Sequence, residues 1–272
     1  MKSQTIFIFS AFLLVTSCEK HDRNDRGQEK SSWVEKVVSK DHGPMRERTV
    51  TGDFDEIEVS QSISAEVIKS DVEKVVISAP QNIIDEVLVD NSGGELHIHY
   101  KPGIRVMNTH NVSAKIYTKD FSNLNANSAA SITVKDKFVQ DKMKVEVSSS
   151  ASVSGDLEAN DFEISIDSSG SFEGKIWAVE LDMDVSSAAS IDLSGKAKNA
   201  EISASSGSSV SAKNVVVQNL KAESSSGASV DISASSSIKA EASSGGSLSI
   251  YKRGNITDIT KEESSGGSVS IQ

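Results

Sequence analysis

The serines of a recurring phrase are the first residues to test for chemistry, and one copy reads SSAASIDLSG at residues 186–195. A serine nucleophile needs an adjacent general base, most often a histidine. All five histidines lie before residue 111, whereas every copy of the phrase comes after it. The Gly-x-Ser-x-Gly pattern of a nucleophile elbow is also absent from the sequence. We therefore predict that these serines are structural.

Acidic side chains are a second candidate, because some β-helices cleave polysaccharides with paired carboxylates or with a calcium-assisted base. The acidic residues that fall at outward positions of the second half are Glu163, Asp167, Asp182, Asp184, Asp192 and Asp231. The sequence shows neither groove-lining aromatics nor an Arg/Lys cluster beside them. It also lacks the glycine- and aspartate-rich nonapeptide that binds calcium between coils. This pattern favours a solvated face, so we predict no enzyme activity, no catalytic residue and no cofactor.

His97 and His99 lie two residues apart on one face of a predicted strand, with His110 further along the chain. Two imidazoles in this arrangement offer two metal ligands. On the outer face of a hairpin such a pair is more often incidental, and we predict no metal site.

The N-terminus predicts export and a lipid anchor. Lys2 precedes an apolar run, Ile6–Val15, that is too short to span a bilayer, which is typical of a signal peptide at 1–17. Val15–Cys18 resembles the lipobox of bacterial lipoproteins and contains the only cysteine of the chain. We predict lipidation of Cys18 and a membrane partner through that anchor; the alternative is an ordinary secretory signal with an incidental cysteine. Glu19 after the cysteine favours the outer membrane, facing either the periplasm or the exterior.

The rest of the chain divides by pattern. Residues 18–45 are charged and polar, which predicts a tether, with a short helical turn around Trp33–Val38 as an option. Residues 46–118 alternate between apolar and polar positions, as strands with one buried face do. Within them, Val87–Tyr100 predicts a hairpin around Asn91–Gly94. The segment PQNIID between two of these strands predicts a loop or one turn of helix.

From residue 119 to 272 one frame repeats: Ser, small, small, Ser, apolar. Its eight copies are 128–132, 149–153, 168–172, 187–191, 206–210, 226–230, 244–248 and 265–269. Successive copies follow at nearly constant intervals, with only small insertions or deletions between them. A period of about 20 residues is typical of a solenoid, in which each coil covers its neighbour.

Alternation before and after each frame predicts coils of two or three short strands separated by tight corners, with a bore too narrow for aromatic rings. Small residues allow the corner to turn, and stacked serines can hydrogen-bond along the axis. Lys261 and Glu263 occupy positions that are apolar in earlier coils, so we predict a polar last coil that protects the open sheet edge.

The strand RTVTGDFDEIEVSQSISAEVI at Arg48–Ile68, the hairpin and the Ser/Gly repeats together resemble the bacterial family called putative auto-transporter adhesin head domain, or GIN domain. The resemblance covers roughly residues 46–272. It implies an all-β fold, a right-handed parallel β-helix or β-solenoid with about 20 residues per coil, continuous with the N-terminal strands and hairpin. It also implies a secreted or lipid-anchored protein with a proposed adhesive role.

These observations lead to one functional expectation and two alternatives. We expect a non-catalytic cell-envelope lipoprotein whose solenoid presents an adhesive or binding surface to glycans or surface proteins. The alternatives are a glycan-processing β-helix enzyme and a structural envelope protein that associates with itself. The net charge of −11 and the lack of a basic stripe exclude nucleic acid as a partner. The oligomeric state stays open.

Overall fold

The computed structural model describes residues 36–38, 43–106 and 111–272. The predicted signal peptide at 1–17, Cys18 and most of the predicted tether lie outside the described residues. His110 also lies outside them. Residues from Glu35 to Gln272 form one compact unit, and the description that follows concerns this unit alone.

The described residues form twenty strands and one short 3-10 helix. The N-terminal elements are β1 (Lys36–Val38), β2 (Met45–Thr51), β3 (Glu56–Val59), β4 (Ser64–Lys69), β5 (Lys74–Pro80), η1 (Ile84–Glu86), β6 (Val87–Ser92), β7 (Glu95–Tyr100), β8 (Ile104–Val106) and β9 (Ser113–Thr118). The repeat region forms β10 (Asn123–Ala126), β11 (Ser131–Val134), β12 (Phe138–Val147), β13 (Ser152–Ile166), β14 (Ser171–Val185), β15 (Ser190–Ala204), β16 (Ser209–Ser224), β17 (Ser229–Ala242), β18 (Ser247–Lys252), β19 (Asp258–Glu263) and β20 (Ser268–Ile271).

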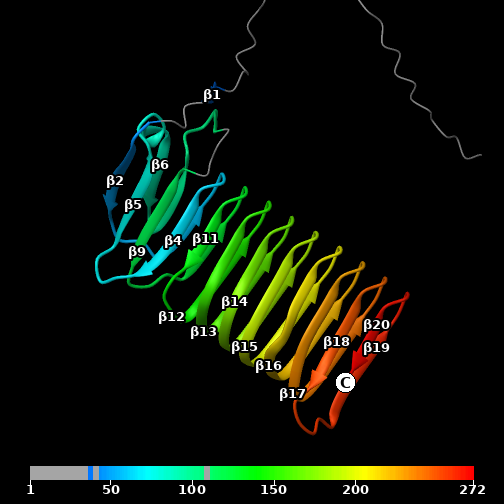
Figure 1. Cartoon of the computed structure of the whole chain (residues 1–272). Coiled ribbons are helices and arrows are strands. Elements are labelled where there is room, and N and C mark those ends of the chain that lie inside the picture. The colour runs from blue at the N-terminus through cyan, green and yellow to red at the C-terminus, as the bar shows by residue number, and fades with distance from the viewer. Residues whose placement is uncertain (1–35, 39–42, 107–110) are drawn as a thin grey trace, which may run out of the picture. The chain divides into compact units, whose positions relative to one another are not determined.

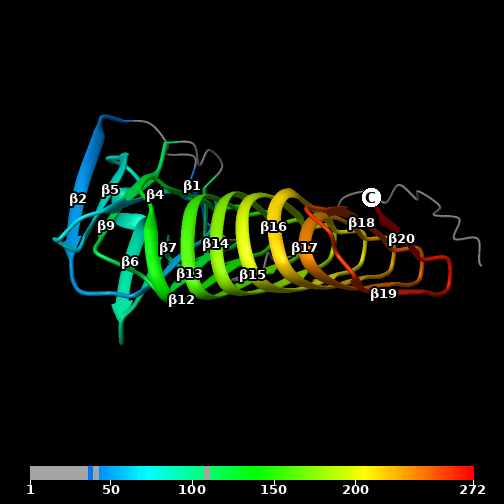
Figure 2. The same ribbon diagram turned by 90° about the horizontal axis from the view of Figure 1, so that it is seen from below.

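The repeat region is a parallel β-solenoid, as the period of the frame predicts. Each strand from β12 to β17 pairs in parallel with the next, and equivalent residues such as Ser152, Ser171 and Ser190 stack in register. Figure 1 shows these strands side by side, and Figure 2 shows the same coils as successive loops along one axis.

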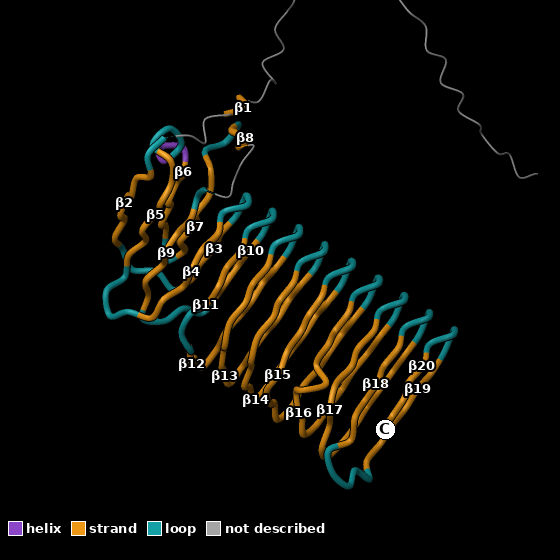
Figure 3. Tube along the Cα trace, in the orientation of Figure 1, coloured by secondary structure: helices purple, strands orange, loops and turns teal. Residues whose placement is uncertain are grey.

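The coils are more continuous than the sequence indicates. β13, β14 and β15 are each a single strand of 15 residues, where the pattern predicts two or three short strands. Each bends around the bore while its hydrogen bonds to the neighbouring coil continue. A loop interrupts these coils at one edge, where Figure 3 shows a row of turns.

Each of those turns consists of the first two residues of the serine frame, and we call it the serine turn. In one coil Ser168 and Ser169 both have positive φ, 48° and 63°. The N–H of Gly170 donates to the carbonyl of Asp167 at 2.8 Å. Two left-handed residues closed by this bond are characteristic of a type I′ turn.

Successive serine turns are joined by the backbone. The N–H of Ser169 donates to the carbonyl of Ser187 in the next coil at 3.0 Å, and the N–H of Ala188 donates to Ser206 in the same way. The first residues of these turns are exposed to solvent. The serine turns of neighbouring coils are therefore joined by backbone hydrogen bonds, whereas from the sequence we expected stacked serine hydroxyls to make these bonds.

The bore holds rings in its N-terminal half, contrary to the sequence prediction. Phe121, Phe138, Phe162 and Phe172 are among the largest fully buried side chains. The rings of Phe121 and Phe138 lie 4.8 Å apart between centroids. Toward the C-terminus the equivalent rows contain smaller residues, such as Ala200 in register with Leu181. Each ring is compatible with the bore because the residues around it vary in size from coil to coil.

The N-terminal strands extend the solenoid and then close it. β3 and β4 pair in parallel with β10 and β11 on one side and with β7 and β9 on the other. β6 then pairs antiparallel with β7, which confirms the predicted hairpin. β5 pairs antiparallel with β9, and β2 pairs antiparallel with β5. For the segment PQNIID we predicted a loop or one turn of helix, and η1 begins at its end, which matches the helical option. Lys36–Val38, in the range predicted as tether, forms a strand that pairs with β8 instead of a helical turn.

The last coil has the polar face that the sequence predicts. All six residues of β19 are exposed, although Lys261 and Glu263 stand in register with the buried Ala240 and Ala242. Lys261 Nζ lies 3.1 Å from Glu263 Oε1, and that oxygen also accepts the N–H of Val269 at 2.6 Å. The two charges therefore bond to each other and to the backbone at the open end.

Candidate functional site

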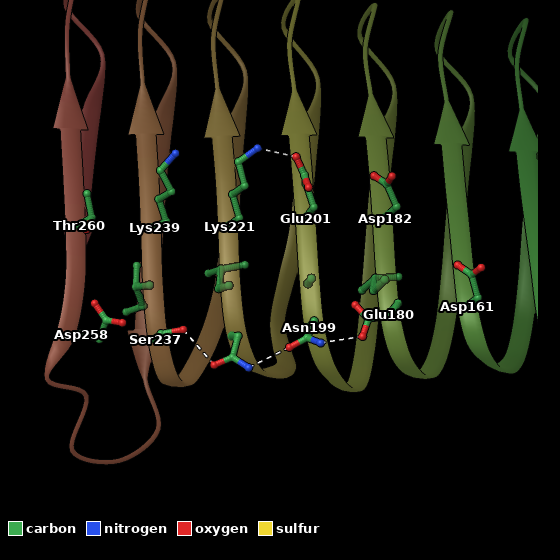
Figure 4. Close-up of a pocket in the computed structure, with 15 residues that line it drawn as sticks. Asp161, Glu180, Asp182, Asn199, Glu201, Lys221, Ser237, Lys239, Asp258 and Thr260 are labelled. Atoms are coloured by element: carbon green, nitrogen blue, oxygen red, sulfur yellow. Dashed lines mark hydrogen bonds and ion pairs between the residues drawn. The ribbon is translucent and has the colours of Figure 1, made fainter.

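A groove with a volume of about 670 Å³ runs across the coils from β13 to β19. Its floor is apolar and contains Leu181, Ala200, Leu220 and Ile238. Two rows of outward side chains flank this floor, because residues on either side of an inward residue point to solvent. Figure 4 shows the part of both rows that lines the groove, from Asp161 to Asp258 in one row and from Asp182 to Thr260 in the other. The stacked register of the coils thus lines one face with side chains from six strands.

One row, which we call the amide row, consists of Asp161, Glu180, Asn199, Asn219, Ser237 and Asp258. The Ser237 hydroxyl donates to Asn219 Oδ1 at 3.0 Å. Asn219 Nδ2 donates to Asn199 Oδ1 at 2.8 Å, and Asn199 Nδ2 donates to Glu180 Oε1 at 2.7 Å. Three bonds with the same direction therefore fix these side chains in a chain that ends on a carboxylate.

The other row, which we call the charged row, consists of Lys144, Glu163, Asp182, Glu201, Lys221, Lys239 and Thr260. Lys144 pairs with Glu163 at 3.1 Å, and Lys221 pairs with Glu201 at 2.5 Å. Hydrogen bonds to Glu201 and Glu223 raise the pKa of Lys221, so this lysine stays charged. After Lys144, the row therefore has carboxylates on three consecutive coils, from Glu163 to Glu201, and then lysines on the next two, Lys221 and Lys239.

Asp182 differs from its neighbours in this row. Partial burial raises its pKa from the ordinary value, and the charges of Glu201 and Glu163 on adjacent coils raise it further. The amide row can exchange hydrogen bonds with a polar ligand, while the carboxylate of Asp182 can accept a hydrogen bond or bind a cationic group. The groove thus has the chemistry of a recognition site.

The structure brings together some of the acidic residues singled out from the sequence and separates others. Glu163 and Asp182 lie in adjacent positions of the charged row, and Asp184 follows Asp182 on the same strand. Asp167 precedes a serine turn. Asp192 and Asp231 lie in the first halves of β15 and β17, away from the groove.

Sequence reasoning missed the polar partners of these acids. Asn199, Asn219, Lys221 and Lys239 all line the groove, although the sequence suggested no lysine cluster beside the acids. The two asparagines stand one coil apart, in register on β15 and β16. An alignment of the coils by strand register, and not by the serine frame alone, is the signal that reveals this column.

His97 and His99 stack with their ring centroids 4.1 Å apart, and both are bound to protein groups. His97 Nε2 contacts Ser60 Oγ at 3.0 Å, and His99 Nε2 contacts Asp90 Oδ2 at 3.0 Å. Burial lowers the pKa of His97 despite the opposing charge of Glu58. Within residues 36–38, 43–106 and 111–272 no group of three or more His, Cys, Asp or Glu side chains is arranged to hold a metal ion.

The described residues contain no helix that is long and apolar enough to cross a membrane. No curated protein matches the chain significantly. A family model described as putative auto-transporter adhesin, head GIN domain, matches residues 53–254.

Several solved structures have the same fold. A putative adhesin from Parabacteroides merdae is 18% identical with a TM-score of 0.76, covering 84% of this chain and 98% of that one. A putative adhesin from Parabacteroides distasonis is 18% identical with a TM-score of 0.75, covering 85% and 98%. A protein from the same species described as a putative lipid binding protein is 19% identical with a TM-score of 0.73, covering 87% and 100%. At these identities the similarity shows the fold alone.

Proposed function

The chain belongs to the family described as putative auto-transporter adhesin, head GIN domain, and from this premise we propose that it is a non-catalytic cell-envelope protein whose groove binds glycans. The family and the solenoid are consistent with a protein of the cell surface or envelope. The adhesive role extends from the family description to this chain only as part of the proposal.

The observation that carries the glycan proposal is the amide row. Asn199, Asn219 and Ser237 stand on consecutive coils and are fixed by hydrogen bonds to one another. Each amide uses one N–H and one lone pair in the row and retains one of each. A surface that repeats such groups at about the spacing of strands, 4.8 Å, suits a polymer of hydroxyl-bearing units lying along the solenoid. Contacts repeated along one rigid rod add in affinity, as in multivalent binding.

The proposal includes the lipid anchor. A signal peptide at 1–17 directs export, lipidation of Cys18 fixes the chain to the outer membrane, and residues 18–45 separate the domain at 46–272 from the bilayer, with coils from residue 119 onward. The domain faces the periplasm or the exterior. The lining of the groove begins at Asp161. The groove is therefore far along the chain from an acyl anchor at residue 18.

A second candidate function is glycan processing in the same groove. The observation that favours it is the position of Asp182 between Glu163 and Glu201, since glycoside hydrolysis uses paired carboxylates. Glu163 and Glu201, on either side of Asp182, are ion-paired to lysines. A carboxylate held in an ion pair is less available as the second catalytic group. We therefore prefer binding, and incubation with bound oligosaccharide followed by mass spectrometry separates the two functions.

The experiment uses a Gram-negative host that carries the full chain. We expect intact cells to adhere to immobilised glycans of at least one class, or, if the domain faces the periplasm, the detergent-extracted full chain to bind them on an array. Asn199→Ala combined with Asn219→Ala should reduce binding about tenfold, because two groups that hydrogen-bond the ligand are lost. A Cys18→Ala variant should leave the membrane fraction and abolish adhesion by cells.

The matched control combines Asp192→Ala with Ser211→Ala. These residues stack on the same two strands, β15 and β16, but outside the groove. This control should bind as the unmodified chain does. Failure of the extracted full chain to bind any glycan would contradict the proposed function, and equal loss in both double variants would contradict the assignment to the groove.

A further inference from the structure

The basic groups of the groove are neutralised by the protein itself. Lys221 Nζ lies 2.5 Å from Glu201 Oε1 and 3.1 Å from Glu223 Oε1. Lys239 Nζ lies 2.7 Å from Glu241 Oε1. An anionic ligand would have to compete with these carboxylates, so the lysines are poor anchors for it.

The carboxylates of the groove are only partly neutralised by ion pairs. Asp161 pairs with Lys142 at 3.3 Å and Glu163 with Lys144 at 3.1 Å. Asp182 has no ion pair and no hydrogen bond with any residue that the structure describes. It stands in register between two carboxylates, as Figure 4 shows for the Glu201 side. Glu180 and Asp258 also line the groove without an ion pair to a described residue, so its uncompensated charge is negative, and of these three acids only Asp182 stands between two carboxylates.

The negative charge at Asp182 favours a ligand with a cationic group. The amide row, across the apolar floor from Asp182, favours a ligand that also has hydrogen-bonding groups. Glu180, on the same strand as Asp182, accepts one bond from Asn199 and keeps its other oxygen for a further donor. Asn199 and Asn219 each retain one donor and one acceptor. Hydroxyl groups, which donate and accept at one atom, match this set better than groups that do only one.

The ligand must therefore combine hydroxyl groups with a cation. A basic peptide offers the cation, but its backbone groups pair best with a strand edge, and this face of the solenoid presents side chains instead. A saccharide with free amino groups offers both features on one extended chain. The apolar floor of Leu181 and Ala200 suits the C–H face of a sugar ring.

We propose that the groove binds glycans that carry free amino groups, with the carboxylate of Asp182 accepting the ammonium and the amide row accepting the hydroxyls. The inference rests on the proposed glycan-binding function and names the class of glycan. Burial raises the pKa of Asp182, and the charges of Glu201, Glu163, Asp184 and Asp161 raise it further; an ammonium group at this carboxylate relieves that repulsion. At acidic pH, where the amino groups of the ligand are already protonated, binding should weaken as Asp182 becomes protonated.

The test compares two probes that differ at one group per unit, the β-1,4-linked hexamer of glucosamine and the hexamer of N-acetylglucosamine. Calorimetry at low salt with the detergent-extracted full chain should show tighter binding of the glucosamine hexamer, about tenfold for one charge-assisted contact. Asp182→Asn should remove this preference. Asp184→Asn, two residues further on the same strand and outside the groove lining, should retain it.

The outcomes separate this inference from the proposed function. Equal affinity for both hexamers, or a preference that survives Asp182→Asn, would overturn the amino-sugar inference while glycan binding stands. Displacement of the hexamer by pentalysine at the same concentration would overturn it in favour of a basic peptide. Absence of binding to any glycan would remove the proposed function itself. Melting curves of both variants confirm that a loss of preference is not a loss of folding.

Discussion

Asp182 shows how one outward carboxylate becomes distinct when coils stack. Partial burial and the carboxylates of Glu201 and Glu163 raise its pKa, and no described residue pairs with it. Neighbouring acids in the same row are bound to lysines. A group whose folded-state pKa is raised binds protons more readily in the folded state, so its charged form destabilises the fold. Charged groups that destabilise the fold are typical of functional sites such as ligand-binding sites.

We predict that Asp182→Asn stabilises the protein near neutral pH. Because the folded-state pKa of this carboxyl lies above its unfolded value, wild-type stability falls as the pH rises between the two values and stays lower above them. The amide carries no charge and escapes this loss. The melting temperature of the variant should exceed that of the wild type at about pH 7, and the difference should shrink toward about pH 4.

Glu241→Gln is the matched control, with the opposite sign. The hydrogen bond and charge of Lys239 lower the pKa of Glu241, so its charged form stabilises the fold above the unfolded value. Its replacement should lower the melting temperature near neutral pH. A lower melting temperature for Asp182→Asn as well would show that Asp182 is stabilised by a partner and would contradict its assignment as the uncompensated charge.

The sequence located the outward acids but not their partners, and the reason is register. β14 and β15 pair at one constant offset, as Glu180 does with Asn199, and the same offset applied to the next coil would place Glu201 opposite Leu220. β16 carries an extra residue at the shift between Asp192 and Ser194, so Glu201 instead aligns with Lys221. Ion pairs between coils depend on such single-residue shifts, which side-chain alternation alone does not locate.

At the scale of the element, the serine turn explains why every copy of the frame begins with serine and two small residues. The first two positions have positive φ, as for Ser187 at 53° and Ala188 at 61°. The third position points inward and is buried, as Ala189 is. The left-handed region excludes β-branched side chains, and the inward position leaves room only for a small group.

We predict that Ser187→Val destabilises the solenoid. Valine in the left-handed region strains the turn. The free energy of unfolding, measured by urea denaturation, should therefore fall by about 2 kcal/mol. Ser190→Val introduces the same side chain three residues later, at the exposed and extended start of β15. That variant should change stability little, since valine favours strands. Equal effects of the two variants would show that the turn conformation is not what selects serine.

The strands were less predictable than the turns for a related reason. The type I′ turn requires residues that tolerate positive φ, and the glycines at Gly207, Gly227 and Gly245 mark it in the sequence. The other bends of β13–β15 occur within continuous hydrogen-bonded strands. The alternation breaks there only locally, as at Gly155 of β13, and the backbone pairing does not end. Small residues in the frame also suggested a narrow bore, although rings such as Phe162 fit where neighbouring coils leave space.

At the scale of the whole solenoid, its ends decide whether it stays separate from other copies. A stack of parallel strands has unpaired backbone groups at each end, which invite pairing with another chain. The N-terminal end is covered by the antiparallel strands β2, β5 and β6. The C-terminal end is β19 and β20, where Lys261 and Glu263 replace the inward apolar residues of earlier coils.

We predict that Lys261→Val combined with Glu263→Val causes association through this end. The change restores the apolar pattern of Ala240 and Ala242 at an edge that no further coil covers, so burying it against another copy becomes favourable. Sedimentation velocity should show larger species that increase with concentration. Lys239→Val with Glu241→Val removes the same pair of charges from the outer face of β17 and should sediment as the wild type does. If both double variants sediment like the wild type, the two terminal charges are not what protects this edge.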